Sequence, residues 1–305
     1  MQQNIHYGFV HLEFGSTYRE SALELLARFR STLAAGGNRF SMVIVDNASA
    51  PGSQPSSYGG QGFADVPVLS GDNSNREFSG WDVGIAAMLA RGDEPDVWIF
   101  SNDSITARHG WSQHRSTRFA QEIAVLSPHE GPWMLGEVTH HPKPMRTPAG
   151  PQLDFVSTYC FAMNRALRQG LVTLSPPPEL LRAAVHDSYE PAHQLFRAEV
   201  DPDYAASQVV WLVTDGEEDS SEKARKYHWS FAWHKAKPLN AQTFGDLRAK
   251  ALCIVSEHAL GARARALGAD LRSPYDARTG RDRLTRTKAY FMDKLWERRY
   301  LRKMK

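Results

Sequence analysis

Short apolar runs alternate with longer amphipathic stretches along the N-terminal part of the chain. Residues 5–14 alternate and are rich in aromatic and β-branched side chains, which predicts a strand. A helix should follow, because leucines recur at helical spacing, Thr17 and Glu20 have the spacing of a capping box, and Gly36 ends the pattern. Residues 40–45 form the next apolar run. A strand, a helix and a strand of these lengths predict a right-handed βαβ unit with parallel strands.

The same pattern continues in the next part of the chain. Residues 66–69 predict a short strand, and a polar loop follows it. Apolar residues then recur at helical spacing over residues 83–89, and a glycine and a proline end that helix. Residues 96–100 predict a short buried strand that ends in four polar residues, 101–104. In open α/β sheets, ligands bind at that end of the strands.

The pattern is less regular in the C-terminal half. Further strands are expected at 133–138, 155–163 and 209–213, and further helices at 108–123, from 164, from 179 and at 192–199. The prolines within residues 140–144 predict an extended loop. Strands that alternate with helices favour an α/β fold with a mostly parallel, Rossmann-like central sheet flanked by helices.

Length and composition narrow the class of protein. The chain has 305 residues, of which 42% are hydrophobic, so it can bury one large core and a small appendage. Charged residues make up 23% and the formal net charge is +2, which gives no general argument for disorder or for a nucleic-acid partner. Cys160 and Cys253 lie in apolar runs, so we expect buried thiols. Without a CxxC motif or a Cys/His cluster, no zinc site is expected.

The chain shows no pattern of a membrane-inserted protein. Its first residues lack the basic segment and apolar core of a signal peptide. No window approaches the roughly 18 consecutive apolar residues of a spanning helix. We therefore expect a cytoplasmic protein that is at most peripheral on the inner membrane.

Polar residues that suit ligand binding follow two of the expected strands. They are Asp46, Asn47 and Ser49 after the first of these strands, and Asn102, Asp103 and Ser104 after the second. Asp, Asn and Ser also favour turns, so the first group alone would be explained by the end of a strand. The two groups together indicate a ligand site at the carboxyl ends of the strands.

A loop–helix segment containing Asn75, Phe78, Gly80 and Gly84 precedes the second polar group. This arrangement resembles the nucleotide-sugar domain of glycosyltransferases with the GT-A fold, in particular family 2 rhamnosyltransferase-like and rhamnan-synthesis-F-like proteins. Those proteins carry a segment of the form N…(F/Y)…G…G, and then a strand that ends in a short acidic motif. A matching aromatic-rich strand extends the resemblance from the first strand to about Gln208.

The resemblance implies a domain organisation and a set of roles. It implies a GT-A domain over residues 1–235, followed by a C-terminal helical extension over residues 236–305. The residues it assigns to donor binding are Asp46, Asn47, Ser49, Asn75, Arg76, Gly80, Asp82 and Asn102. It assigns a divalent cation, Mn²⁺ or Mg²⁺, to Asp103, with His228 as a second candidate metal ligand.

The resemblance also implies a catalytic base. Inverting enzymes of this fold use a carboxylate to accept the proton of the attacking hydroxyl. The family's tyrosine–glutamate pair matches Tyr189 and Glu190, which makes Glu190 the expected base and Asp187 its competitor. A carboxylate at a helix N-terminus also has a plain capping role, so both interpretations stay open for each residue.

The function that follows is inverting sugar transfer from a nucleotide diphosphate donor, such as a rhamnose or other deoxysugar donor. The acceptor would be a glycan or lipid-linked glycan in bacterial surface polysaccharide synthesis. The chain departs from the common DxD motif, because Asp103 is the single carboxylate of its motif. Metal affinity should then be weaker, and in metal-independent transfer Arg76, Lys143, Arg146 or a helix N-terminus would hold the diphosphate. The competing interpretation is a catalytically silent glycan- or nucleotide-binding subunit of a polysaccharide assembly complex.

The composition shifts over residues 276–305. This segment contains eleven Lys and Arg against four Asp and Glu, interleaved with aromatic and leucine side chains at roughly helical spacing. A basic amphipathic helix of this kind fits an anionic membrane surface, and the lipid-linked substrates of the resembling family favour that partner. A terminal helix packed on the core also fits the pattern, and nucleic acid is the least favoured partner.

Overall fold

The computed structural model describes residues 4–34, 37–49, 63–107, 109, 111–126, 128–191, 194–214, 237–275, 287 and 291. The chain divides into two compact units. The first unit comprises Met1–Thr139, Val156–Leu174 and Ala264–Lys305, and the second comprises His140–Phe155 and Ser175–Arg263. The predicted boundary between residues 235 and 236 lies outside the described residues.

Parallel strands form the centre of the first unit. β1 (His6–Glu13) lies between β2 (Arg39–Asp46) and β4 (Val97–Asn102) and runs parallel to both. β3 (Val68–Ser70) adds a parallel edge strand to β2. All residues of β1 and β4 are buried, and β1 includes the polar residues His6, His11 and Glu13. The predicted parallel βαβ unit is confirmed.

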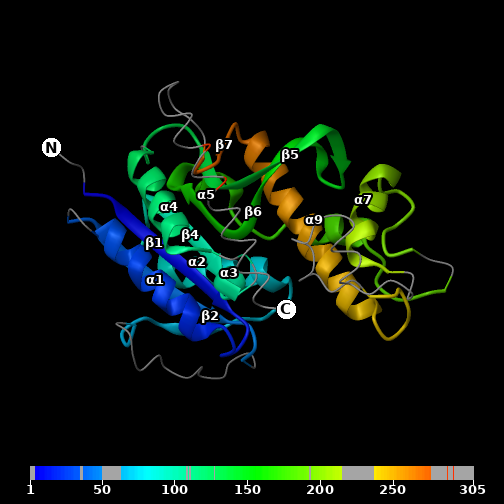
Figure 1. Ribbon diagram of the computed structural model, residues 1–305, viewed down its shortest axis with the longest axis horizontal. Helices are drawn as coiled ribbons and strands as arrows, with labels where there is room; N and C mark the ends of the chain where they lie inside the picture. Colours follow the sequence, from blue (N-terminus) through cyan, green and yellow to red (C-terminus); the bar gives the residue numbers. More distant parts are fainter. Residues whose placement is uncertain are drawn as a thin grey trace. The chain divides into compact units, whose positions relative to one another are not determined.

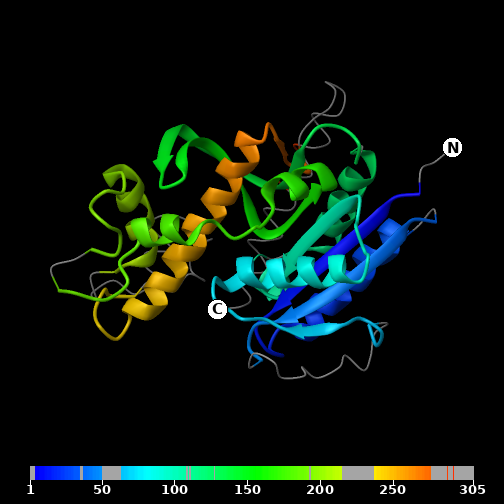
Figure 2. The same cartoon turned by 180° about the vertical axis from the view of Figure 1, so that it is seen from behind.

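Two helices cover opposite faces of these strands. α1 (Arg19–Ala34) lies over one face (Figure 1), and α2 (Arg76–Ala90) lies over the other (Figure 2). α2 approaches β1 closely because two of its positions lack a side chain. A Cβ at Gly84 would lie 2.3 Å from Val10 Cγ1, and one at Gly80 would lie 2.1 Å from Leu12 Cδ1. The two glycines of the family-like segment therefore have a packing role in this fold.

The sheet continues beyond β4 with a long hairpin. β6 (Gly150–Asn164) pairs antiparallel with β4, β5 (Trp133–Thr147) lies beside β6, and β7 (Asp270–Arg272) pairs parallel with β5. Over the described residues the strand order is β3-β2-β1-β4-β6-β5-β7, so the central sheet is mixed. The helices α3 (Ser104–Ala107), α4 (Gln113–Val125) and α5 (Arg165–Leu171) complete this unit. The expected α/β class with a central sheet and flanking helices is confirmed.

The second unit has a core of its own. It contains the far end of the β5–β6 hairpin, α6 (Pro178–Ala184), α7 (Pro202–Leu212) and most of α9 (Phe244–Ala266). Phe196, Tyr204 and Leu247 are among its buried side chains. The Tyr204 hydroxyl lies 2.9 Å from His258 Nδ1, so these two buried polar groups are hydrogen-bonded to each other.

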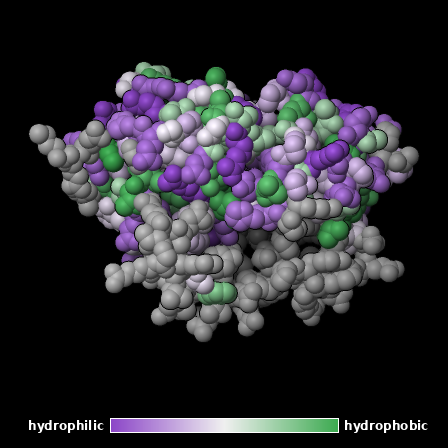
Figure 3. Space-filling view, turned by 90° about the horizontal axis from the view of Figure 1, so that it is seen from above, coloured by the Kyte–Doolittle hydropathy of each residue, from purple (hydrophilic) through white to green (hydrophobic). Residues whose placement is uncertain are grey.

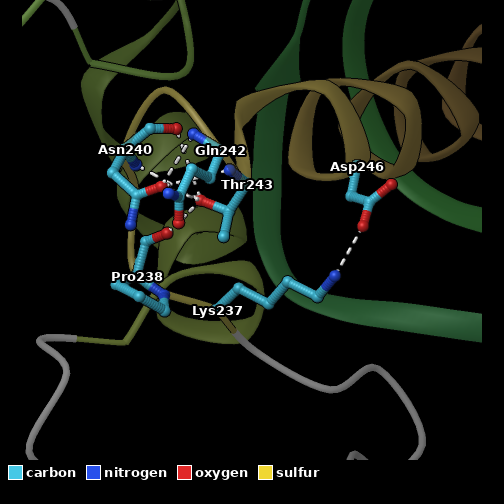
Figure 4. Close-up of polar contacts among 6 residues, drawn as sticks. All are labelled: Lys237, Pro238, Asn240, Gln242, Thr243 and Asp246. Atoms are coloured by element: carbon cyan, nitrogen blue, oxygen red, sulfur yellow. Dashed lines mark hydrogen bonds and ion pairs between the residues drawn. The ribbon is translucent and has the colours of Figure 1, made fainter.

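A polar turn begins α9 (Figure 4). The Asn240 carboxamide oxygen accepts hydrogen bonds from the backbone N–H groups of Gln242 and Thr243, at 2.9 and 3.1 Å. Lys237 forms an ion pair with Asp246 in the first turn, with 2.5 Å between Nζ and Oδ2. The hydrogen bonds to Asn240 order the turn that precedes α9, and the ion pair links Lys237 to the first turn of the helix.

Three predicted elements of the C-terminal half are wrong. Of residues 209–213, expected as a strand, 209–212 form the end of α7, and Val213 forms an isolated bridge with Lys237. Within the predicted helix 192–199, the described residues 194–199 are not helical, and Phe196 instead forms an isolated bridge with Val185. The expected loop 140–144 continues strand β5.

The described residues contain no helix that is both long and apolar enough to cross a bilayer. On the face drawn in Figure 3, hydrophobic residues are scattered among hydrophilic ones. Apart from Thr287 and Phe291, residues 276–305 lie outside the described part of the chain, so the predicted basic helix is not described.

Candidate functional site

The strand order reverses between β1 and β4. From β1 the chain moves to β2 and β3 on one side, and then α2 carries it back to β4 on the other side. In doubly wound sheets a ligand binds outside the carboxyl ends of the strands at such a switch point. We define the carboxyl edge as the residues at the ends of three strands: Glu13–Gly15 at β1, Asp46–Ser49 at β2 and Asn102–Ser104 at β4.

Two of the predicted carboxylates meet at the carboxyl edge. The backbone N–H of Phe14 donates to Asp103 Oδ2 at 3.0 Å, and the N–H of Gly15 donates to Asp46 Oδ1 at 3.2 Å. Asp103 itself donates its N–H to the carbonyl of Leu12 at 2.8 Å. Because Phe14 and Gly15 are consecutive, Asp46 and Asp103 together hold one turn between β1 and α1.

Asp46 is fixed by several donors. Ser49 Oγ donates to Asp46 Oδ2 at 2.6 Å, and the Ala48 N–H donates to Oδ1 at 2.9 Å. Burial alone would raise the pKa of Asp46, but the hydrogen bonds from Ser49, Ala48 and Gly15 and the charge of Arg19 outweigh it and lower that pKa. Asp46 therefore stays ionised over the neutral range, and Ser49 has a clear role in orienting it.

Asp103 has the opposite electrostatic character. Burial raises the pKa of Asp103 to about 6, and the negative charges of Glu13 and Glu77 add to this effect against the Phe14 hydrogen bond. The side chain is 4% exposed. The carboxyl edge thus holds one carboxylate that is easily ionised and one that takes up a proton near neutral pH.

A buried ion pair at this edge was not predicted. Glu13 is completely buried, and its Oε1 lies 2.6 Å from Nη2 of Arg19 at the start of α1. On the same face of β1, His11 Nδ1 lies 2.8 Å from Ser101 Oγ, and burial lowers the pKa of His11 to about 3. The available signal was the alternation of β1, which places His11 and Glu13 among buried apolar positions.

The remaining predicted donor residues make local contacts at or near the carboxyl edge. Asn47 donates from Nδ2 to the carbonyl of Arg76 at 2.9 Å, which joins the end of β2 to the start of α2. Arg76 has a positive φ of 47°, and Asn75 precedes the helix without a side-chain capping bond. Ser104 Oγ donates to Asn102 Oδ1 at 2.8 Å, so these two side chains orient each other.

Asp82 does not take part in the contacts that join Asp46 and Asp103. Its Oδ1 accepts the backbone N–H of Leu174 at 2.6 Å. Leu174 follows a tight turn at Val172, where φ is 63° and the Thr173 N–H donates to the Leu171 carbonyl at 2.7 Å. That conformation is strained for a β-branched residue, so Asp82 anchors the chain next to a strained turn.

The described residues do not assemble a metal site. No three His, Cys, Asp or Glu side chains among them come together as cation ligands. His228, the second predicted ligand, lies outside the described residues.

The two candidate bases belong to the second unit. Asp187 lies between two guanidinium groups: Arg248 Nη2 is 2.6 Å from Oδ1, and Arg197 Nη2 is 3.4 Å from Oδ2. Glu190 is exposed three residues later. Both oxygens of Asp187 therefore have arginine partners.

Comparison with known proteins adds no family assignment. No protein-family model matches the chain, and no curated protein matches it significantly.

Proposed function

We propose that this protein is an inverting glycosyltransferase that moves a sugar from a nucleotide diphosphate donor to a glycan or lipid-linked glycan. The observation that carries the proposal is the position of Asp103, which bonds Phe14 across the β1/β4 switch point. Asp46 bonds the next residue of the same turn. Ligand sites of open α/β sheets occur at this position, and both residues match the sugar-nucleotide motifs of the resembling family.

The reaction needs an activated acceptor and a stabilised leaving group. The acceptor oxygen attacks the anomeric carbon, the bond from that carbon to the diphosphate breaks, and Glu190 takes the hydroxyl proton. A positioned base contributes about 10²- to 10⁴-fold to such a step. A cation shared between Asp103 and the donor's own phosphate oxygens stays a prediction.

Incubation with a panel of nucleotide sugars tests the proposal. The wild-type protein should release free nucleotide from one donor, slowly to water and faster with a suitable glycan acceptor. Asp103→Ala and Glu190→Ala should each abolish transfer. The matched control is Glu179→Ala, which removes another exposed carboxylate of the second unit and should leave turnover unchanged. Normal turnover in both test variants would contradict the assignment of this protein as a glycosyltransferase that uses Asp103 and Glu190.

A second candidate is a catalytically silent subunit that binds a nucleotide or glycan. The single carboxylate in the motif and the mutual hydrogen bond of Asn102 and Ser104 favour it, because neither asparagine nor serine supplies the charge that a second aspartate would. Nucleotide binding without any donor breakdown in the same panel would support this candidate over transfer.

The cellular setting is part of the proposal. A role in bacterial surface polysaccharide synthesis would bring lipid-linked acceptors to the cytoplasmic face of the inner membrane. The basic, aromatic residues of 276–305 suit an anionic surface, which would place the enzyme close to such acceptors. Nucleic acid stays the least favoured partner.

A further inference from the structure

The loop before α2 holds two non-glycine residues in the left-handed region of the backbone map. Asn73 has a φ of 51°, and Arg76, the first residue of α2, has a φ of 47°. Residues other than glycine adopt this conformation where the surrounding structure fixes it. We therefore expect specific contacts to the backbone of Arg76.

Two buried side chains make such contacts. Asn47 donates from Nδ2 to the carbonyl of Arg76 at 2.9 Å, and Ser79 donates from Oγ to the same carbonyl at 3.2 Å. Ser79 Oγ also accepts the backbone N–H of Asn75 at 3.0 Å. The carbonyl of Arg76 is thus held from the end of β2 and from within α2.

The Asn47 carboxamide is confined on the side of its oxygen. A Cβ at Gly71 would lie 1.7 Å from Asn47 Oδ1, and one at Gly80 would lie 3.1 Å from it, so the amide fills space that two glycines leave. This oxygen is buried and accepts no hydrogen bond from the described residues. A buried acceptor without a partner disfavours folding, so stability alone does not explain an asparagine at this position.

The charges near the loop differ in whether they are paired. Negative charges are numerous, because Glu13 and Glu77 both act on Asp103. Arg19 engages both oxygens of Glu13, at 2.6 and 3.1 Å. The guanidinium of half-buried Arg76 makes no ion pair or hydrogen bond with any residue that the structure describes. Of these two arginines, Arg76 is the one whose charge is not already paired.

We propose that Arg76 binds the diphosphate of the donor, and that Asn47 and Ser79 are positioning residues that hold Arg76 at the carboxyl edge. A guanidinium can donate two parallel hydrogen bonds to phosphate oxygens and offset the charge that develops on the leaving group. Arg76 belongs to the first unit, as the carboxyl edge does, whereas Lys143 and Arg146 belong to the second. This inference rests on the proposed function.

Calorimetric titration of the full chain with ADP, GDP, UDP and dTDP, each beside its parent nucleoside, tests the proposal. With EDTA present, wild type should bind one diphosphate more tightly than the matching nucleoside. Arg76→Gln should weaken that diphosphate by about 10- to 100-fold, because a charged hydrogen-bond donor is lost, and leave the nucleoside within about twofold. Arg76→Lys keeps the charge but not the planar fork, so its affinity should fall between the two.

Asn47→Ala and Ser79→Ala test the positioning role. Each removes one of the two hydrogen bonds to the Arg76 carbonyl and should weaken the diphosphate by about 3- to 10-fold. Neither should cause a further loss when it is combined with Arg76→Gln, since both act through Arg76. The matched control is Arg91→Gln, which removes a positive charge at the other end of α2, roughly 20 Å away, and should leave binding unchanged.

Several outcomes would overturn this inference alone. They are a diphosphate affinity of Arg76→Gln within twofold of the control, a parallel loss of nucleoside and diphosphate, or binding that requires Mn²⁺ and does not respond to Arg76→Gln. Unchanged affinity in both Asn47→Ala and Ser79→Ala would overturn the positioning role. A wild-type protein that binds none of the four diphosphates, in EDTA or in Mn²⁺, would overturn the proposed function as well.

Discussion

Asp103 is the residue at which stability and proposed function conflict. Its carboxylate is buried beside two other negative charges, which raises its pKa from 3.8 to about 6. A buried charge of this kind disfavours folding, and such groups collect at functional sites. Sequence patterns place Asp103 correctly at a strand end. They do not predict the ion pair of Glu13 with Arg19, because Glu13 lies within a mostly apolar strand and Arg19 follows only after a turn.

The raised pKa of Asp103 predicts a pH-dependent gain from Asp103→Asn. Stability from this group is fully present below its unfolded pKa of 3.8 and is lost as pH rises through about 6. Asparagine stays neutral and can still accept the Phe14 N–H through its oxygen. The variant should therefore be more stable than wild type by about 1–2 kcal/mol at pH 8, with little difference at pH 4.

Urea unfolding of both proteins at the two pH values measures this difference, and comparing them at each pH removes the contribution of the other carboxylates. A variant that is less stable than wild type at pH 8 would show that the charge of Asp103 is favourable in the fold. The raised pKa would then be wrong.

At the scale of elements, the strength of the local signal decides which predictions hold. β1 and β4 are buried along their whole length, and their many aromatic and β-branched residues predict strands. Residues 209–213 are strand-like in sequence, yet 209–212 form the end of a helix. Asp201 caps that helix by accepting the N–H groups of Asp203 and Tyr204, and Pro202 occupies its first turn. Capping and burial of Tyr204 outweigh the weak β preference of the valines.

The extent of β5 could not be read from the sequence either. Prolines within residues 140–144 suggested a loop, but the strand continues through them to Thr147. Its partner β6 begins at Gly150, shortly after the end of β5, and extends to Asn164. A long hairpin is stabilised by the pairing of its two strands. The strand propensity of one segment by itself does not include this pairing.

Two glycine substitutions should change stability differently, because only Gly84 lies where α2 contacts β1. Gly84→Ala places a methyl group 2.3 Å from Val10 Cγ1, so it should destabilise the protein by about 1–3 kcal/mol. Gly245→Ala is the matched control on α9, where no described atom beyond the local backbone lies within 4 Å of the added group. It should be neutral or stabilising by roughly 0.5 kcal/mol, because alanine favours helix.

Thermal unfolding of the two variants beside wild type checks this pair. If Gly84→Ala were as stable as Gly245→Ala, α2 would not approach β1 closely enough to exclude a methyl group, and the packing account of the family-like glycines would fail.

At the scale of the whole chain, the topology of the first unit supplies the argument for a ligand site. The parallel βαβ start was predictable, but the reversal between β1 and β4 needs the pairing of strands about 90 residues apart. That reversal brings Asp46 and Asp103 to consecutive residues of one turn, and it leaves Asp82 bonded to Leu174 instead. Of the predicted aspartates, Asp46 and Asp103 therefore bond the same turn, next to the ion pair of Glu13 and Arg19.

The most direct test of the account is a thermal-shift screen of the full chain with nucleoside diphosphates, with and without Mn²⁺. A ligand at 100 times its Kd stabilises the folded state by about 2.7 kcal/mol, which raises the melting temperature measurably. The account predicts that one nucleoside diphosphate raises it in wild type and that Asp46→Ala and Asp103→Ala each lose most of the rise. No response to any nucleotide, or an undiminished response in both variants, would contradict a nucleotide site at the carboxyl edge.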